Sequence, residues 1–128
     1  PFGMWFAVLV NSWLMTIVFM VTRMVIRRLS RQAGLLFLTT FWMSFELLHL
    51  HWDFSWPWFQ LGNVFSETTS WIQWYEYTGV FGGSLWVWIV NILCFQAVRG
   101  TSFEFRKLAL GIVAIAIPIG ISLLIYSN

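Results

Sequence analysis

Four long apolar stretches, at residues 2–22, 33–52, 77–98 and 108–126, leave few folds open to this sequence. Each holds about 20 residues, and a helix of that length is about 30 Å long, which matches the hydrocarbon core of a bilayer. Because backbone groups in lipid must be hydrogen-bonded within the chain, the stretches are predicted to be helices rather than open strands. The predicted fold class is therefore all-α: a polytopic membrane protein fragment with four transmembrane helices.

The composition supports a membrane class and excludes others. The chain of 128 residues is 59% hydrophobic and 9% charged, whereas an ordinary soluble domain is about 25% charged. Seven basic and five acidic residues cannot cover a soluble surface, and a net charge of +2 is too small to indicate a nucleic-acid partner. The lone Cys94 excludes an internal disulfide. The first apolar stretch is too long for a signal peptide, and from the start at Pro1 we expect a piece of a longer protein.

The basic residues predict how the helices are oriented. All seven Lys and Arg residues lie in two connections, residues 23–31 and 99–107, whereas the connection at residues 53–76 has none. By the positive-inside rule, the two basic connections are expected in the cytoplasm, with residues 53–76 and both chain ends on the outer, periplasmic side. More polypeptide is expected on that side after Asn128.

The connection at residues 53–76, called here the aromatic segment, is too apolar for an ordinary hydrated loop. It reads DFSWPWFQLGNVFSETTSWIQWYE and is predicted to lie in the interface on the outer side of the membrane. Pro57 should end the second helix before it, Gly62 is typical of a turn, and residues 66–70 can cap a short helix over 69–76. The indole and phenol rings fit either a belt that anchors the protein among headgroups or the lining of a lipid-facing cavity.

Glu46, His49 and Asp53 are spaced i, i+3, i+7 and share one helix face. Glu-x-x-His is also half of a di-iron ligand set, but the sequence holds no second copy, which disfavours a metal site. Two interpretations stay open: a hydrogen-bonded polar stripe that faces other helices, or direct contact with a substrate. An ionisable residue within a membrane helix is a candidate for function by default, so Glu46 and His49 are kept as candidates.

The third helix begins with glycines that indicate close packing. Gly79 and Gly83 form a small-xxx-small pair with Gly82 beside them, a pattern that lets another backbone approach. Ser84 and Asn91 follow at a spacing of seven residues on nearly one face. Interhelical hydrogen bonds are favoured for these two side chains over contact with a ligand. All five residues are therefore predicted to pack helices together.

Pro118 lies inside the fourth predicted helix. It lacks an N–H, so it frees the carbonyl group of Ala114 and is predicted to kink the helix. Cys94 lies in an apolar stretch, where it is expected to pack and stay inert. The sequence holds no hydrolase triad, phosphate loop or metal cluster, and no cofactor is expected. The 128-residue piece alone is therefore not expected to catalyse a reaction.

Several short blocks of residues occur in a defined order along the chain. W-P-W at 56–58 is followed by L-G-N at 61–63, then by Q-x-x-E-Y-T-G-V-x-G-x-S-x-W at 73–86 and V-N at 90–91. These blocks resemble the membrane domain of apolipoprotein N-acyltransferases. The tail I-P-I-G-I-S-L-L-I-Y-S-N is similar to the last helix of Bacteroidetes-like members. The resemblance covers nearly the whole chain from Phe37 on.

The resemblance implies a reaction and a location. The family transfers an acyl chain from a phospholipid to the α-amino group of the N-terminal diacylglyceryl-cysteine of lipoproteins, at the outer face of the bacterial inner membrane. Its Glu-Lys-Cys catalytic set belongs to a nitrilase-like domain, which is expected after residue 128 and is absent from this chain. Cys94 matches no nitrilase motif. The implied partners are membrane lipids, a phospholipid acyl donor and a lipoprotein acceptor.

Under this resemblance, the chain anchors the enzyme and helps to form the cleft through which lipidated substrates enter. Such a cleft needs an apolar wall and a few polar contacts for headgroups. The candidates for these contacts are Glu46, His49, Trp56, Trp58, Gln60, Gln73, Glu76 and Tyr77.

A different class of function is a small non-catalytic membrane subunit or a transporter fragment. Charged residues at the midplane, or broken helices in an internal repeat, would favour that interpretation. Here the ionisable residues gather near the outer edge of the spans, and no repeat is visible. The sequence therefore favours the acyltransferase interpretation.

Overall fold

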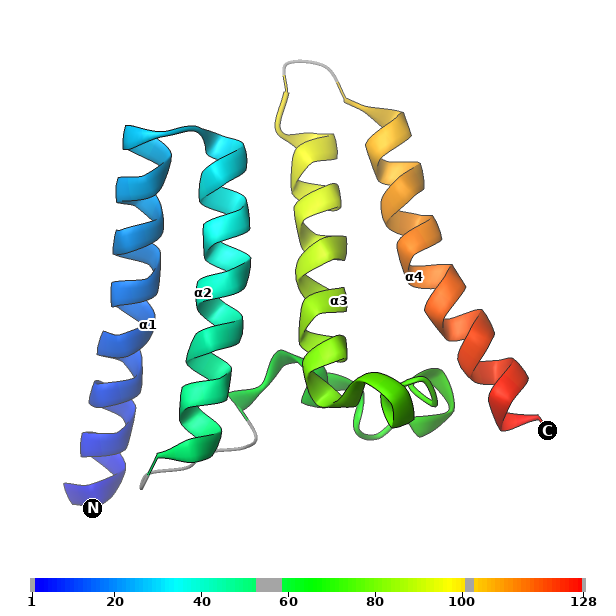
Figure 1. Cartoon of the computed structure of the whole chain (residues 1–128), viewed down its shortest axis with the longest axis horizontal. Coiled ribbons are helices and arrows are strands. Elements are labelled where there is room, and N and C mark those ends of the chain that lie inside the picture. Colours follow the sequence, from blue (N-terminus) through cyan, green and yellow to red (C-terminus); the bar gives the residue numbers. More distant parts are fainter. Residues whose placement is uncertain (1, 53–58, 101–102, 128) are drawn as a thin grey trace. The chain divides into compact units, whose positions relative to one another are not determined.

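The structure is a computed structural model that describes residues 2–52, 59–100 and 103–127. Its main elements are α1 (Phe2–Arg28), α2 (Arg31–His51), α3 (Tyr75–Val98) and α4 (Phe105–Tyr126) (Figure 1). It is 87% helical and has no strand among the described residues. Each of the four helices is long and apolar enough to cross a membrane. The predicted all-α class with four candidate membrane spans is therefore confirmed.

The first and last helices extend beyond the apolar stretches into the basic connections. α1 continues past residue 22 to Arg28, and α4 begins at Phe105 rather than at residue 108. Arg and Lys are good helix formers, and their long side chains can reach out of the hydrocarbon core while the backbone stays helical. The helices are therefore longer than the stretches that predict them.

The chain divides into two compact units, an N-terminal unit (Pro1–Phe45) and a C-terminal unit (Glu46–Asn128). The last turns of α2 therefore belong with the C-terminal unit. In the N-terminal unit, α1 and α2 form an antiparallel hairpin (Figure 1). Ser30, in the connection, accepts a hydrogen bond from the Ala33 N–H at 3.1 Å through its Oγ atom, and so caps α2.

Apolar and aromatic side chains join the two helices of this hairpin. Gly34 is buried, and a Cβ atom at this position would overlap the Ile26 side chain. Farther along, the Phe19 and Trp42 rings have centroids 6.0 Å apart. The hairpin thus uses the close packing that a small residue allows between membrane helices.

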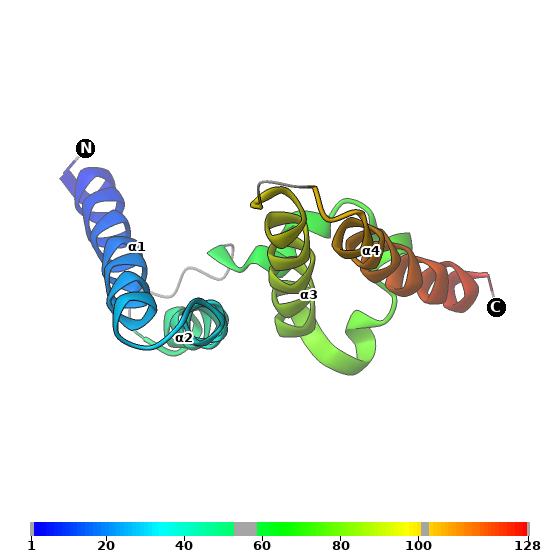
Figure 2. The same ribbon diagram turned by 90° about the horizontal axis from the view of Figure 1, so that it is seen from above.

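In the C-terminal unit, α3 lies beside α4 (Figures 1 and 2). Two short 3-10 helices of the aromatic segment pack on them: η2 (Leu61–Phe65) on α3 and η3 (Thr69–Trp71) on α4. The predicted helix over 69–76 is wrong, because Ile72 has non-helical dihedral angles (φ −126°, ψ 25°) that end η3. The predicted cap is wrong too, since the side chain of Thr68, at the N-cap, makes no capping hydrogen bond.

Gly79 divides α3 into two directions. Its φ of 65° and ψ of −175° are non-helical, a combination that is essentially confined to glycine. The turn before it, residues 75–78, lies across the axis of the rest of the helix (Figure 1). The kink thus turns the side chains that precede Gly79 toward the part of α3 that follows it.

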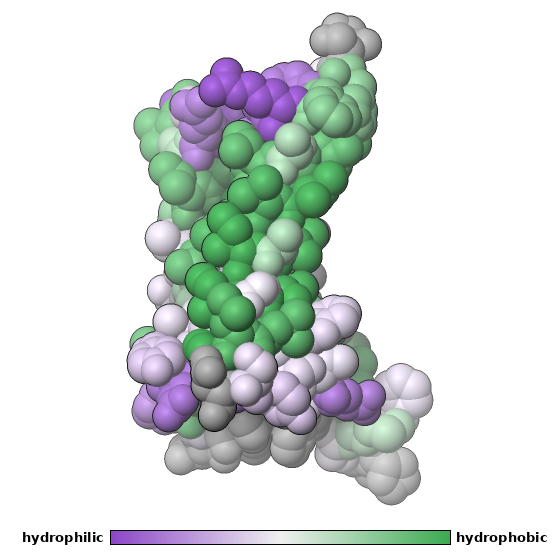
Figure 3. All heavy atoms as spheres, turned by 90° about the vertical axis from the view of Figure 1, so that its right-hand side faces the viewer, coloured by the Kyte–Doolittle hydropathy of each residue, from purple (hydrophilic) through white to green (hydrophobic). Residues whose placement is uncertain are grey.

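The surface of α4 is apolar along most of its length. Figure 3, seen from the α4 side, shows hydrophobic groups along this helix and more hydrophilic groups at its ends. A helix in a membrane presents such a face to lipid or to a neighbouring helix. Its large exposed side chains include Leu110, Ile112, Val113, Ile117, Ile121 and Leu124.

Candidate functional site

Three side chains hold the backbone of the aromatic segment at Leu61 and Gly62. Glu46 Oε1 accepts a hydrogen bond from Leu61 N at 2.9 Å, and Ser84 Oγ accepts one from Gly62 N at 3.0 Å. Tyr75 Oη donates to the Gly62 carbonyl oxygen, also at 3.0 Å. We call Glu46, Tyr75 and Ser84 the η2 anchor. Their bonds supply partners to backbone groups that buried irregular chain would otherwise leave unpaired.

The η2 anchor is shielded from the surroundings. Glu46 is 1% exposed and Ser84 is fully buried. A buried hydrogen bond to backbone is costly to break, because the group left behind has no water to replace its partner. The anchor therefore fixes η2 against the end of α2 and against α3.

Gly62 is where two backbones meet most closely. A Cβ atom at Gly62 would overlap the carbonyl oxygen of Val80 and would lie 3.1 Å from Ser84 N. Both neighbours are backbone atoms of α3, which cannot rotate away. Glycine is therefore required at this position for steric reasons, and the sequence had indicated it only as a turn residue.

The glycines of α3 have a different role from the predicted approach of another helix backbone. A Cβ atom at Gly83 would overlap the Tyr75 hydroxyl group, and one at Gly82 would overlap Thr78 and approach the Trp74 ring. A Cβ atom at Gly79 would meet nothing within 4 Å. Among the residues that the structure describes, Gly82 and Gly83 thus make room for side chains folded back by the kink, and Gly79 supplies the kink.

Trp86 joins η2, α3 and α4. Its ring centroid lies 4.9 Å from that of Phe65 and 5.7 Å from that of Trp74. Its Nε1–H donates to the Ala114 carbonyl oxygen at 2.6 Å. This is the carbonyl that Pro118 leaves without a helical donor. The sequence predicted the free carbonyl but not the indole that binds it.

The residues predicted to line a cleft fall into two groups. Glu46, His49 and Gln60 are buried, with exposed fractions of 1%, 1% and 8%. The His49 ring lies 5.0 Å from the Trp52 ring and 6.4 Å from the Phe59 ring, between centroids. These three side chains are therefore packed inside the C-terminal unit rather than presented on its surface.

The second group is accessible. Tyr77 is 78% exposed and Glu76 is exposed, whereas Gln73 is half-buried and donates from Nε2 to the Thr69 carbonyl oxygen at 2.8 Å. The remaining candidates, Trp56 and Trp58, lie outside the described residues, as does Asp53 of the predicted polar stripe.

Two further predicted features have simple local surroundings. Asn91 is exposed and donates from Nδ2 to the Val87 carbonyl oxygen of its own helix at 2.8 Å, instead of bonding to another helix. Cys94 Sγ lies 3.4 Å from the point that a Cβ atom at Gly111 would occupy, so it packs between α3 and α4. Within the described ranges, no three His, Cys, Asp or Glu side chains are grouped as metal ligands.

Taken together, these contacts position a short irregular segment across the ends of membrane helices. Some of the polar groups in this arrangement bind backbone, as Glu46 and Ser84 do, and others, such as Glu76, are exposed. The segment thus combines aromatic and apolar side chains with a few polar ones, the residue types that line sites for amphipathic ligands.

Comparison with known proteins identifies the family. A protein-family model described as the apolipoprotein N-acyltransferase N-terminal domain matches residues 1–93. The match includes α1, α2, the aromatic segment and most of α3; the resemblance of the tail beyond it stays a prediction. No curated protein and no solved structure matches the chain. With four helices able to span a bilayer and a match over most of its length, this chain is a membrane protein that belongs to the apolipoprotein N-acyltransferase family.

Proposed function

We propose that the chain is the membrane portion of an apolipoprotein N-acyltransferase. In this reaction an acyl chain passes from a phospholipid to the α-amino group of a lipoprotein's diacylglyceryl-cysteine. The chain would anchor the enzyme in the bacterial inner membrane and form part of the cleft by which both lipidated substrates reach the catalytic residues. The observation that carries the proposal is the family match over residues 1–93.

The geometry of the aromatic segment supports a lipid-access role. The η2 anchor seats irregular backbone on α3, and η3 packs on α4. Acyl chains need apolar walls, and headgroups need a few polar contacts. We assign the polar contacts to Gln73, which is half-buried just before α3, and to Glu76 and Tyr77, which are exposed in its first turn. Trp56 and Trp58 complete the proposed rim.

The chemical step is proposed to lie elsewhere, on a nitrilase-like domain that follows residue 128. Its Glu-Lys-Cys set would supply the base and the nucleophile. Cys94 is packed between α3 and α4, so it has no part in the reaction.

The experiment is N-acylation of a reporter lipoprotein in cells depleted of their own N-acyltransferase. The intact protein is expected to convert the diacyl form to the triacyl form, as measured by mass spectrometry of the N-terminal peptide. Replacement of both Glu76 and Tyr77 by Ala should slow the conversion about tenfold or more, equivalent to about 1.4 kcal/mol in the barrier. Cys94→Ala should leave the rate unchanged. No conversion by the intact wild-type protein, at normal abundance, would refute the proposal.

The proposed orientation has its own test. Single cysteines at Arg27 and at Glu67, in a Cys94→Ser background, can be treated with an impermeant thiol reagent in intact spheroplasts. Because the arginines predict that residue 27 is cytoplasmic, only the cysteine at position 67 should be labelled. Labelling at 27 and not at 67 would reverse the orientation.

A further inference from the structure

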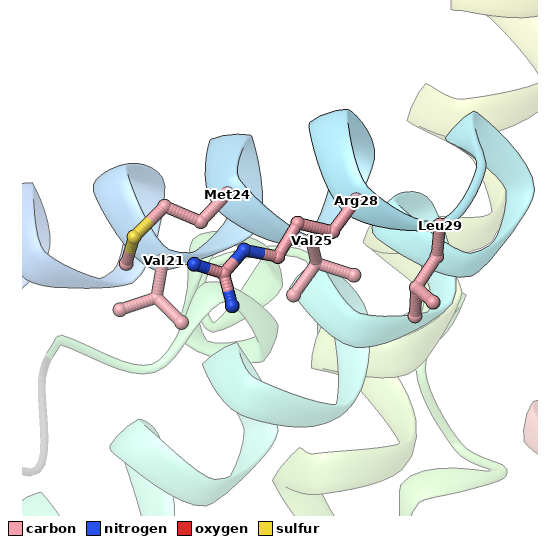
Figure 4. Close-up of a pocket in the computed structure, with 5 residues that line it drawn as sticks. All are labelled: Val21, Met24, Val25, Arg28 and Leu29. Carbon is pink, nitrogen blue, oxygen red and sulfur yellow. The ribbon is translucent and has the colours of Figure 1, made fainter.

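The end of α1 carries a shallow hollow that none of the contacts described so far explains. It has a volume of about 350 Å³ and is lined by Val21, Met24, Val25, Arg28 and Leu29 (Figure 4). The volume is within the range of pockets that hold small molecules. Four of the five lining residues are apolar, so the hollow fits a hydrocarbon chain better than a polar ligand.

Arg28 adds a charge to the apolar wall. Figure 4 shows its guanidinium group beside Val21 and Val25, on the same side of α1 as the hollow. A guanidinium group offers several N–H donors in a planar fork that matches phosphate oxygens. A ligand that fills this hollow and binds Arg28 must therefore join an apolar chain to an anion.

The charge balance of the N-terminal unit also favours an anionic ligand. Residues 1–45 contain four arginines, Arg23, Arg27, Arg28 and Arg31, and no Asp or Glu. Within the described part of this unit, no carboxylate is thus present to pair with them. Such an unbalanced basic cluster at the end of a membrane helix attracts anionic lipid headgroups.

The length of α1 brings this end to the headgroup level. α1 has 27 residues, and a helix of that size is about 40 Å long, whereas the hydrocarbon core is about 30 Å thick. A span that begins near Phe2 would therefore place Val21 and Met24 near the end of the core and Arg28 at the level of the phosphates.

We propose that this hollow binds one anionic phospholipid of the leaflet that faces the basic connections, with part of an acyl chain against Val21, Met24 and Val25. The phosphate is bound by Arg28. Such a site differs from the proposed acyl-donor cleft, whose polar candidates belong to the C-terminal unit, and the predicted orientation assigns the two to opposite leaflets.

The test is native mass spectrometry of the intact protein, titrated with phosphatidylglycerol or with phosphatidylcholine of the same acyl chains. The wild-type protein should bind phosphatidylglycerol about fivefold more tightly or better, and Arg28→Gln should remove that preference. Arg27→Gln is the matched control, because it removes the same charge one residue away and does not line the hollow. It should change the affinity less than twofold.

A second pair of variants tests the apolar wall. Val25→Trp fills the hollow and keeps all four arginines, so it should weaken phosphatidylglycerol binding about as much as Arg28→Gln does. Val8→Trp adds the same bulk on an exposed part of α1 and should bind like wild type. Should Val25→Trp fail to accumulate, the two arginine variants decide the question.

The other outcomes would overturn the proposal. Equal losses in Arg27→Gln and Arg28→Gln would mean diffuse attraction of the basic cluster for any anionic surface. Displacement of the lipid by glycerol 3-phosphate would mean an anion site that needs no acyl chain. No lipid preference in the intact protein would mean that another part of the protein covers the hollow.

Discussion

The two units of this chain differ in how some of their polar side chains bind backbone. In the N-terminal unit, the hydroxyl groups of Thr16, Thr22 and Thr39 each donate to the carbonyl group four residues earlier in the same helix. In the C-terminal unit, Ser84 and Trp86 bind backbone in other elements. The first unit is a hairpin packed through apolar groups, whereas the second contains irregular backbone secured by directed bonds.

The difference follows from what each unit must build. A helix satisfies its own backbone, so a helical hairpin in lipid needs only close packing. A segment such as η2 has unpaired N–H and C=O groups, which must find side-chain partners where water is scarce. Polar side chains that bind the backbone of another element are therefore expected where the chain is irregular, as at η2.

The strongest test of this contrast is the same substitution in both units. Gly62→Ala places a Cβ atom against the Val80 backbone, so it should lower the free energy of unfolding by about 3 kcal/mol, at the upper end of overpacking costs. Gly34→Ala meets the side chain of Ile26 instead, which can shift, and should cost about 1 kcal/mol. Unfolding in sodium dodecyl sulfate measures both. Equal costs would show that η2 is not seated on α3 as described.

The kink at Gly79 gives a somewhat smaller effect. Gly79→Ala forces a Cβ atom into a backbone conformation that suits only glycine and should cost about 2 kcal/mol. Gly120→Ala is the control, because a Cβ atom at either position meets nothing within 4 Å, and only Gly79 has a positive φ. The control should be neutral or slightly stabilising in the same unfolding assay. A neutral Gly79→Ala would mean that α3 runs straight.

The bond between Trp86 and Ala114 can be tested with a double-mutant cycle. Trp86→Phe removes the donor and leaves the carbonyl group unpaired, at a cost of about 2 kcal/mol. Pro118→Ala restores an N–H that can bind the same carbonyl. In that background, Trp86→Phe should cost less than about 1 kcal/mol. Equal costs in both backgrounds would show that the indole contributes by packing alone.

The smallest expected effect comes from removing one hydroxyl group in each unit, at Ser84 and at Thr39. Ser84→Ala leaves Gly62 N without its partner and should cost about 1 kcal/mol. Thr39→Val removes a hydroxyl group whose acceptor, the Leu35 carbonyl, is already part of the helix, so it should change the free energy of unfolding by less than about 0.5 kcal/mol. If the two substitutions change the free energy of unfolding equally, the Ser84 bond stabilises the protein no more than a hydroxyl bond within a helix does.

The fold was largely predictable from the sequence, because length and apolar composition are enough to identify membrane helices. The site was less so. Ser84 was predicted to bond outside its own helix, yet its partner is Gly62 of the aromatic segment. The close backbone contact was sought at Gly79 and Gly83, from the small-residue spacing, and occurs at Gly62. Such contacts depend on which elements meet in space, and periodicity within one helix does not encode them.

Pro118 shows where sequence reasoning succeeded in part. The missing N–H of a proline identifies the carbonyl four residues earlier, at Ala114, as an acceptor in need of a donor. Several indoles in the chain were equally suitable donors on chemical grounds. Only the packing of α3 on α4 selects Trp86.

The kink in α3 also adjusts the protein to the thickness of its membrane. A straight helix of 24 residues is about 36 Å long and would have to tilt or thicken the bilayer around it. The part after Gly79 has about 19 residues and spans about 28 Å, close to the hydrocarbon thickness. The turn before Gly79 is then not needed to span the hydrocarbon core and can run along the membrane surface. One glycine thereby relieves hydrophobic mismatch and, in the same bend, supplies the surface ledge on which Glu76 and Tyr77 are exposed.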